Sequence, residues 1–225
     1  IVDKNVAKKA IPENGYVVNM AALIGIPYSY EAPESYVNTN IYGSLNYLNE
    51  SLNKNIKGFI QTSTSETYGT AQYVPIDELH PAVGQSPYAA TKIAADQLAL
   101  SFYKSFNLPV AIIRPFNTYG PRQSTRAVIP TIITQILSGK RIIKLGSLSP
   151  TRDFNFVLDT CSAFLSVSKS ESAVGRIINS ASNFEISIGK TSKLISELMD
   201  TDIKIETDDE RIRPKLSEVN RLFGD

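Results

Sequence analysis

Tyr88 and Lys92 lie four residues apart in the run SPYAATK, and their side chains are suited to proton transfer. Residues four apart on a helix share one face, so the Lys92 ammonium can lie beside the Tyr88 phenol. Free tyrosine has a pKa of about 10, too high for a base at neutral pH, and a nearby positive charge favours the phenolate. The pair is therefore a candidate base, although an exposed tyrosine and a solvated lysine would give the same spacing.

A second polar cluster is the run TSTSETYG at residues 62–69, which follows an apolar stretch. It contains Thr64, Ser65 and Glu66, and Glu66 is its only carboxylate. A single carboxylate where a strand gives way to a loop raises the question of which reaction needs one acid at that position. The run RPFNTYGPR at residues 114–122 also places polar residues after an apolar stretch. These segments form the candidate site.

Alternating strands and helices would bring these groups together. Apolar runs predict strands at residues 16–22, 58–64 and 109–115, and helical spacing predicts helices at residues 35–53, 87–106 and 128–137. Ser86 and Pro87 suit the N-cap and the first position of the second helix. Such alternation implies parallel β-α-β units, whose ligands lie beyond the carboxyl ends of the strands. We therefore predict an α/β fold, a Rossmann-like doubly wound parallel sheet.

The pattern loosens after Gly120. Shorter strand-like pieces occur at residues 141–145, 153–157, 176–181 and 203–207, with helices near 159–168, 189–199 and 217–223. We predict a main domain at residues 1–120, to which some later segments contribute, and mainly a smaller mixed α/β lobe at residues 121–225. A lobe beside such a sheet forms the kind of cleft in which small molecules bind.

Composition excludes several classes of protein. The chain has 225 residues, 42% of them hydrophobic, and a net charge of +1, which provides no field for nucleic acid or an anionic membrane. One cysteine and one histidine exclude an internal disulfide framework and a Cys/His metal site. We expect Cys161 in the core and His80 at the surface. Without a membrane-length apolar run or a signal pattern, we expect a reduced, cytoplasmic protein.

Seven segments, in this order and spacing, resemble the extended short-chain dehydrogenases that modify nucleotide sugars, the NAD-dependent epimerase/dehydratase family. They are NMAALIGIPYS, YVNTNIYGSLN, TSTSETYG, SPYAATK, RPFNTYGPRQ, PTRDFNFVLD and RIRPKLSEV, and they cover nearly the whole chain. Within the family, the chain is most similar to the 4,6-dehydratases of legionaminic-acid-type pathways, which act on nucleotide-linked N-acetylglucosamine. The segments that carry this similarity are ALIGIPYSY, TSTSETYGTAQYVPIDE, RPFNTYGPRQSTRAVIPTI and SLSPTRDFNFV. The resemblance implies that residues 1–120 bind NAD and that residues 121–225 bind the nucleotide sugar.

The resemblance also implies roles for the candidate residues. Tyr88 would take the proton of the sugar 4-hydroxyl while NAD accepts the C4 hydride, and Lys92 would bind the nicotinamide ribose and lower the Tyr88 pKa. Thr64 would hydrogen-bond the same hydroxyl. The resulting C4 carbonyl acidifies the C5 hydrogen, which Glu66 would remove. Loss of water from C6 and return of the hydride to C6 would give a 4-keto-6-deoxy sugar.

Further positions match binding residues of the family. Asn117 would face the sugar diphosphate, and Arg152 and Arg213 would bind the nucleotide diphosphate, because guanidinium forks match phosphate geometry. Surface ion pairs with Asp153, Asp209 or Glu210 are the alternative for the two arginines. The cofactor-side positions are Ala21, Ala22, Asn40 and Pro115, in addition to Tyr88 and Lys92. Core packing accounts equally well for the two alanines.

The N-terminal segment departs from the family. A glycine-rich strand-to-helix loop and an acidic residue for the adenosine ribose are required by an NAD-binding sheet of this kind, and neither precedes Tyr16. We expect that about 60 residues, two β-α-β increments, are missing from the front. Without them, the chain would bind NAD poorly.

Ser65 is the second departure, because many 4,6-dehydratases have Asp directly before the Glu. Either Glu66 alone moves the proton from C5 to the C6 hydroxyl while Ser65 holds the geometry, or the substrate is a nucleotide-linked uronic acid that decarboxylates after oxidation at C4. A C4 epimerase would leave Glu66 without a role and ranks below both. The non-enzyme alternative is a nucleotide-sugar-binding relic.

The helices at residues 35–53 and 87–106 carry apolar and aromatic residues around much of their surfaces. By family resemblance, we expect them to pair across a two-fold axis as a four-helix bundle in a homodimer. Burial within one subunit is the alternative.

Overall fold

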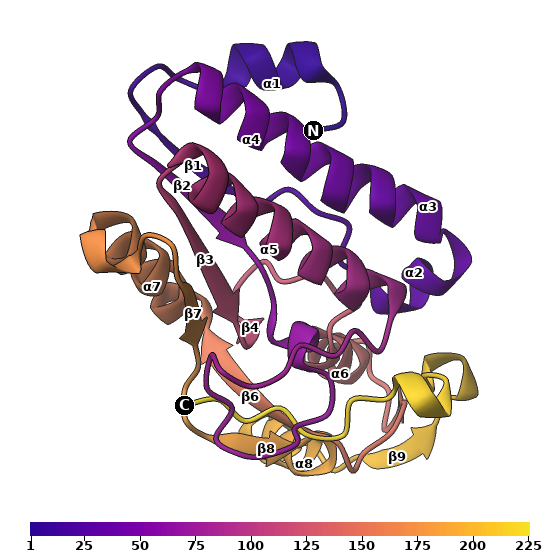
Figure 1. The fold of residues 1–225 in the computed structure, drawn as a ribbon. Helices are drawn as coiled ribbons and strands as arrows, with labels where there is room; N and C mark the ends of the chain where they lie inside the picture. Colours follow the sequence, from indigo (N-terminus) through magenta and orange to yellow (C-terminus); the bar gives the residue numbers. More distant parts are fainter.

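A computed structural model describes residues 1–225, with the Glu210 side chain outside the described part. Its main sheet has four parallel strands in the order β1–β2–β3–β7 (Figure 1). These strands are β1 (Tyr16–Asn19), β2 (Gly58–Thr62), β3 (Val110–Pro115) and β7 (Ile177–Ser180). Because all four are parallel, their carboxyl ends meet at one edge. The predicted Rossmann-like α/β fold is confirmed.

Helices cover both faces of this sheet (Figure 1). On one face lie α4 (Gly43–Asn53) and α5 (Pro87–Phe106), with α1 (Lys4–Ala10) packed outside α4. The other face is covered by α7 (Val157–Lys169), which packs on β2 and β3. The predicted helix at residues 35–53 consists of α3 (Pro33–Tyr36), a π-helical turn (Val37–Tyr42) and α4, which follows α2 (Ile26–Glu31).

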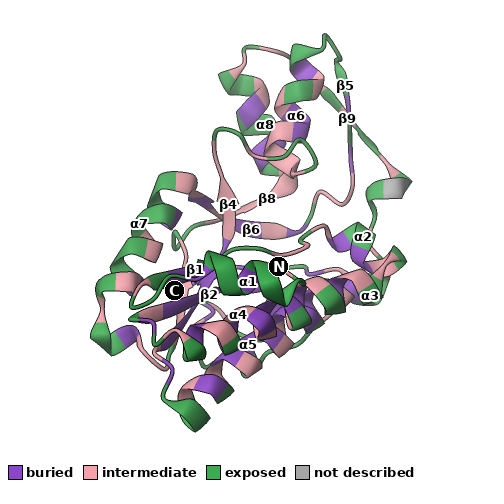
Figure 2. Cartoon of the chain, turned by 90° about the horizontal axis from the view of Figure 1, so that it is seen from above, coloured by how far each residue is buried: buried purple, intermediate pink, exposed green. Residues whose placement is uncertain are grey.

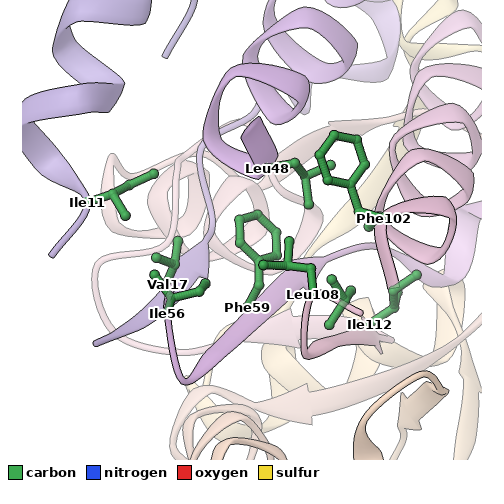
Figure 3. Close-up of a cluster of buried hydrophobic side chains, with 10 residues drawn as sticks. Ile11, Val17, Leu48, Ile56, Phe59, Phe102, Leu108 and Ile112 are labelled. Carbon is green, nitrogen blue, oxygen red and sulfur yellow. The ribbon is translucent and has the colours of Figure 1, made fainter. Parts of the chain in front are cut away.

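Strand β3 explains why the sheet needs both layers. Val110 and Ile112 pack with helices α4 and α5, while Ala111 and Ile113 pack with α7. Successive side chains of a strand point to opposite faces, so an unbroken apolar run suits a strand covered on both sides. Figure 3 shows the first cluster, in which Phe59 of β2 lies close to Leu48 and Phe102 of the two helices.

The smaller lobe has its own core. Helices α6 (Val128–Leu137) and α8 (Ile188–Leu198) pack against the parallel pair β5 (Ile142–Leu145) and β9 (Lys204–Thr207). Figure 2 shows these four elements projecting away from the main sheet. Between them and the main sheet lies a three-stranded sheet in the order β4–β6–β8, formed by β4 (Asn117–Tyr119), β6 (Thr151–Phe156) and β8 (Glu185–Ser187). Two elements from residues beyond 120 are part of the main domain: strand β7 is in the main sheet, and helix α7 packs on it.

The helix predicted at residues 217–223 is wrong. A short 3₁₀ turn (Lys215–Ser217) is followed by an extended segment whose backbone bonds to distant residues. Thr151 donates to the Asn220 carbonyl at 3.0 Å, and Ile76 donates to the Phe223 carbonyl at 2.8 Å. Val219 and Leu222 are buried in a cluster with Ile76 and aromatic side chains, so tertiary packing overrides the local helical pattern.

Two predicted placements are also wrong. His80 is buried, not at the surface: it is 3% exposed, and its Nε2 accepts a hydrogen bond from the Gln72 amide at 2.9 Å. Cys161 is exposed, not in the core. The inward face of α7 is formed by Ala163, Phe164 and Val167, and Cys161 lies on the other side of the helix. His80 packs against the Tyr68 and Tyr73 rings of its own loop region. The exposure of Cys161 is decided by which face of α7 packs on the sheet.

Candidate active site

The turn that follows β2 holds Glu66. It is a 3₁₀ turn (Ser65–Tyr68) capped by Thr64, whose Oγ1 accepts a hydrogen bond from the Glu66 amide at 3.2 Å. Gly69 ends the turn with φ +66° and ψ −155°, a conformation that favours glycine. A Cβ at this position would lie 2.8 Å from the Val83 carbonyl oxygen. The local sequence therefore directs Glu66 to the carboxyl edge of the sheet.

Helix α5 places the tyrosine and the lysine at the same edge. Ser86 caps it by accepting a hydrogen bond from the Ala89 amide at 3.1 Å, and Pro87 is its first residue, as predicted. Tyr88 and Lys92 are buried, with 7% and 4% of their surfaces exposed. Lys92 Nζ donates to the Thr62 carbonyl at 2.5 Å, where β2 ends. The structure therefore brings the Tyr–Lys pair and the turn containing Thr64 and Glu66 together.

Burial dominates the electrostatics of this pair. It raises the pKa of Tyr88 above its usual range, an effect that the Thr64 hydroxyl opposes and the Glu66 and Asp96 carboxylates increase. Burial also lowers the pKa of Lys92 to about 8, and Asp96 opposes that change. In this structure burial therefore outweighs any lowering of the Tyr88 pKa by Lys92. The reason is that desolvation is the larger effect and the ammonium is bound to the Thr62 carbonyl.

Two arginines lie beside Glu66. Arg213 Nη1 is 3.4 Å from Glu66 Oε2, and Arg152 Nη2 is 3.8 Å from Glu218 Oε1. Burial lowers the pKa of Arg152, while the Glu66 and Glu218 carboxylates oppose that change. The two cationic groups thus lie beside two carboxylates, those of Glu66 and Glu218. Of the acids considered from sequence, Asp153 and Asp209 are not their partners among the described ion pairs, and the Glu210 side chain lies outside the described residues.

The remaining predicted positions differ in their exposure and in whether their side chains have hydrogen-bond partners. Asn117 lies on β4, and its Oδ1 is buried without a hydrogen-bond partner among the described residues. Pro115 ends β3. Ala21 is exposed just after β1, so core packing does not account for it, whereas Ala22 is half-buried.

Asn40 is fully engaged by the protein. On the π-helical turn, its Oδ1 accepts from the Leu23 amide at 2.8 Å, and its Nδ2 donates to the Leu23 carbonyl and to Thr91 Oγ1, both at 3.0 Å. These bonds tie the loop after β1 to the helix that carries Tyr88. Asn40 therefore holds the loop after β1 against α5 at the carboxyl edge of the sheet.

The residues at this edge fit the nicotinamide-ribose end of a dinucleotide. Exposed Ala21 leaves the backbone open to approach, and Thr62 Oγ1 is a buried hydroxyl without a partner among the described residues. Lys92 lies beside it as a donor. By contrast, the described residues contain no group of three His, Cys, Asp or Glu side chains suited to a metal ion.

A buried network below the site was missed from sequence. Asp96, on the same face of α5 as Lys92, binds Ser63 of the β2 exit and Arg114 of β3. An acid four residues after the candidate lysine, in a helix with many alanines, was an available signal. Its arginine partner could be found only in the tertiary structure.

The fold and these side chains define the class of the protein. A parallel sheet with a Thr–Glu turn and a Tyr–Lys helix at one edge is the arrangement of an extended short-chain dehydrogenase/reductase. The chain belongs to the family described as GDP-mannose 4,6 dehydratase, whose model matches residues 1–225. The resemblance to nucleotide-sugar epimerases and dehydratases is thereby confirmed.

The chain is similar to solved structures of both epimerases and dehydratases. The low-salt glycan biosynthesis protein Agl12 of Haloferax volcanii is 32% identical over 88% of this chain and 63% of that protein. The solved UDP-N-acetylglucosamine 4-epimerase of Methanobrevibacter ruminantium is 31% identical, with a TM-score of 0.88 over 97% of this chain and 70% of that one. The dTDP-glucose 4,6-dehydratase DesIV of Streptomyces venezuelae, with NAD and TYD bound, has a TM-score of 0.90 over 100% of this chain and 68% of that one. At 22% identity, it shows the fold alone.

The chain spans between 42% and 63% of the length of the curated relatives that it matches, several of which are dTDP-glucose 4,6-dehydratases. Within the part of the chain that the structure describes, every helix is too short or too polar to cross a membrane.

Proposed function

We propose that the protein is an NAD-dependent nucleotide-sugar 4,6-dehydratase that acts on UDP- or GDP-N-acetylglucosamine. The observation that carries the proposal is the position of Glu66, a single carboxylate on the turn capped by Thr64, at the sheet edge that also holds Tyr88 and Lys92. For oxidation at C4, which uses NAD as the hydride acceptor, the tyrosine and the lysine are the only groups needed for proton transfer. A carboxylate beside them supplies the base for elimination across C5 and C6.

The chain's own residues would perform three tasks. Tyr88, once its phenol is ionised, accepts the proton of the sugar 4-hydroxyl, and Thr64 Oγ1 holds that hydroxyl. The Lys92 ammonium stabilises the phenolate and donates to the nicotinamide ribose. NAD, when bound, supplies the hydride acceptor and donor. Glu66 removes the C5 proton, which the C4 carbonyl has made acidic, and delivers it to the departing C6 hydroxyl. When the hydride returns to C6, C5 takes up one proton, which balances the proton that Tyr88 accepted from the 4-hydroxyl.

Ser65 supports the use of one carboxylate for both transfers. Its side chain is buried, with 2% of its surface exposed, directly before Glu66. A serine hydroxyl can hold a water or relay a proton, but it is far too weak an acid to protonate a leaving group directly. Dehydration with this residue pair therefore requires that Glu66 first gains the C5 proton and then donates it on the same face of the sugar.

The binding groups suit a sugar diphosphate. Arg213 and Arg152 lie around Glu66, and an incoming diphosphate would compete with the carboxylates for their guanidinium groups. Asn117 offers its side-chain amide at the start of β4, where its Oδ1 lacks a partner among the described residues. N-acetylglucosamine as the sugar is supported by the relative named a UDP-N-acetylglucosamine 4-epimerase.

A nucleotide-sugar C4 epimerase is the second candidate, favoured by the same relative at 31% identity. It would use Tyr88 and Lys92 but give Glu66 no proton to move. A decarboxylase of nucleotide-linked uronic acids is the third, because Ser65 removes the acid that dehydration otherwise uses on C6. A nucleotide-sugar-binding relic without activity would use only the binding groups.

Product analysis separates these candidates. The full-length protein is incubated with NAD and, separately, with UDP- and GDP-N-acetylglucosamine, UDP-glucose and UDP-glucuronate, and the products are identified by NMR. We expect a 4-keto-6-deoxy sugar from one of the N-acetylglucosamine nucleotides. A C4-inverted sugar would establish the epimerase, and a pentose with carbon dioxide the decarboxylase. Absence of any product would leave the binding relic.

Glu66→Gln tests the carboxylate directly. Loss of a proton-transfer group typically lowers the rate about a hundred- to ten-thousandfold, so we expect turnover to fall by at least a hundredfold while nucleotide binding persists. The matched control is Ser65→Ala in the same turn, which we expect to retain turnover within about tenfold because it removes a hydroxyl that holds the geometry and leaves the carboxylate in place. Near-normal turnover in Glu66→Gln would remove the proposed mechanism.

We also propose a cytoplasmic homodimer. Helices α4 and α5 lie side by side on one face of the sheet (Figure 1). Tyr42, at the end of the π-helical turn before α4, Leu52 of α4 and Phe106 of α5 are exposed at 57%, 37% and 53%. Pairing these helices with a second copy would cover such side chains. Sedimentation that shows a concentration-independent monomer, or fractionation that places the protein outside the cytoplasm, would contradict the respective part.

A further inference from the structure

Asp96 is a buried acid that the proposed chemistry does not use. It lies on α5 one turn after Lys92 and has no exposed surface. Its Oδ2 accepts hydrogen bonds from Ser63 Oγ at 2.7 Å and from Arg114 Nε and Nη2 at 3.2 and 3.0 Å. Three hydrogen bonds converge on this oxygen, and two of them come from Arg114, a permanent cation. Burial raises the pKa of Asp96, whereas Arg114 and Ser63 oppose that change and favour the carboxylate.

These contacts join the three elements that build the site. Ser63 stands between Thr62, whose carbonyl accepts from Lys92 Nζ, and Thr64, which caps the turn of Glu66. Arg114 lies on β3 directly before Pro115, and its guanidinium packs over the Tyr68 ring, with Cζ 4.7 Å from the ring centroid. Asp96 therefore connects α5 to the exits of β2 and β3.

The cost of burying this carboxylate indicates a role beyond packing. Removing an ion from water costs several kcal/mol, and apolar residues often replace a buried ion pair without loss of stability. The charged groups that face Asp96 are Arg114 from β3 and Lys92 from its own helix. Asp96 is also the charged group that faces Lys92, whereas β2 provides only the Thr62 carbonyl dipole.

We propose that Asp96 is a positioning residue that keeps the Lys92 ammonium charged and fixed against the end of β2. Spaced four residues apart, Tyr88, Lys92 and Asp96 form one column on α5, with the carboxylate at the buried end and the phenol at the site. The carboxylate counteracts the loss of hydration around Lys92, so the lysine retains the charge that the Tyr88 phenolate needs. This inference rests on the proposed function for its catalytic meaning.

Lysine titration by NMR tests the inference without substrate. The full chain is labelled with ¹³C at lysine Cε, and the Lys92 signal is assigned from its loss in Lys92→Met. We expect a midpoint of about 8 in the unaltered protein. Loss of a close opposite charge shifts a pKa by about one unit or more, so Asp96→Asn lowers that midpoint by at least about one unit. An unchanged Lys92 midpoint in folded Asp96→Asn would overturn the inference.

Two controls separate charge from shape. Ser63→Ala removes one hydrogen bond to Asp96 but keeps the carboxylate, so we expect a much smaller shift of the Lys92 midpoint. Asp202→Asn removes a negative charge from an exposed loop and should leave the midpoint unchanged. If Asp96→Asn fails to fold because Arg114 is left unpaired, the double variant Asp96→Asn/Arg114→Met replaces it. That variant should still lower the midpoint, and an unchanged midpoint there would also overturn the inference.

A rate profile then links the charge to turnover. If the protein has the proposed activity, the alkaline limb of kcat/KM should move to lower pH in Asp96→Asn by the same amount as the Lys92 midpoint. A shifted midpoint in a protein that yields no 4-keto-6-deoxy product would contradict the proposed function and leave the electrostatic role of Asp96 standing. Formation of the 4-keto-6-deoxy product with an unshifted Lys92 midpoint in Asp96→Asn would support the proposed function and overturn the electrostatic role of Asp96.

Discussion

Asn40→Ala should lower the free energy of unfolding substantially, although the side-chain amide that it removes is small. The amide makes three hydrogen bonds, two to the backbone of Leu23 and one to Thr91 Oγ1, and Asn40 is only 1% exposed. Each such bond contributes about 1 kcal/mol net, and a buried group left without a partner costs about 1–3 kcal/mol. Thr91 keeps its own bond to the Tyr88 carbonyl at 2.8 Å, and water can reach half-buried Leu23. We therefore expect a loss of about 2–3 kcal/mol in the free energy of unfolding.

Urea unfolding measures this loss. Far-UV circular dichroism and tyrosine fluorescence are both suitable, because the chain has 11 tyrosines and no tryptophan. In a chain of this size, the expected loss lowers Tm by about 5–10 °C. Asn38→Ala is the matched control, since Asn38 is exposed on the same π-helical turn and should change stability by less than about 0.5 kcal/mol.

Hydrogen exchange gives a local readout of the same contact. The Leu23 amide donates to Asn40 Oδ1, so its exchange should accelerate in Asn40→Ala and remain slow in Asn38→Ala. Equal stability of the two variants, or an unchanged exchange rate at Leu23, would refute the conclusion that Asn40 holds the loop after β1 against α5.

Lys92→Met should stabilise the chain near pH 7 while removing a group that the proposed chemistry needs. The folded pKa is lowered from 10.5 to about 8, so the unfolded chain binds more protons between those values and stability rises with pH across that window. The buried charge of Lys92 thus lowers the free energy of unfolding by about 3 kcal/mol at neutral pH. The substitution removes this cost, but it also removes the hydrogen bond to the Thr62 carbonyl, which contributes about 1 kcal/mol. The resulting gain of about 2 kcal/mol in urea unfolding should nearly vanish by about pH 9.5, and a gain independent of pH would contradict this origin. Gly69→Ala should lower Tm more than Gly139→Ala, because both glycines have positive φ but only at Gly69 would the new Cβ meet backbone, whereas at Gly139 it meets nothing within 4 Å. Equal losses of Tm would show that contact with the Val83 carbonyl is unimportant.

Elements with strong local signals were predictable from sequence. Helix α5 begins at Pro87 because Ser86 provides the cap and Pro87 the pre-set backbone angle, and α6 spans the predicted residues because its apolar residues repeat with helical spacing. The segment at residues 217–223 has apolar residues at ambiguous spacing. Its conformation is decided by backbone bonds to residues more than 60 positions away, which no local pattern encodes.

The candidate site shows the same division. Thr64, Glu66, Tyr88 and Lys92 were identified from sequence because they stand at the ends of predicted elements, and parallel strands bring those ends to one edge. The contacts that set their charges were not identifiable. Arg213 lies 147 residues from Glu66 in the chain, and Arg114 lies 18 residues from Asp96 on a different element.

The sequence by itself determined the order of strands and helices, the family and the residues suited to proton transfer, because periodicity, capping and motif spacing are local properties. Only the tertiary structure decided the environment of those residues. Burial raises the pKa of Tyr88 and lowers that of Lys92, and Asp96 opposes the second change from one turn below. Desolvation and ion pairing depend on every neighbour in space, so they follow from the packed fold and from no single stretch of the chain.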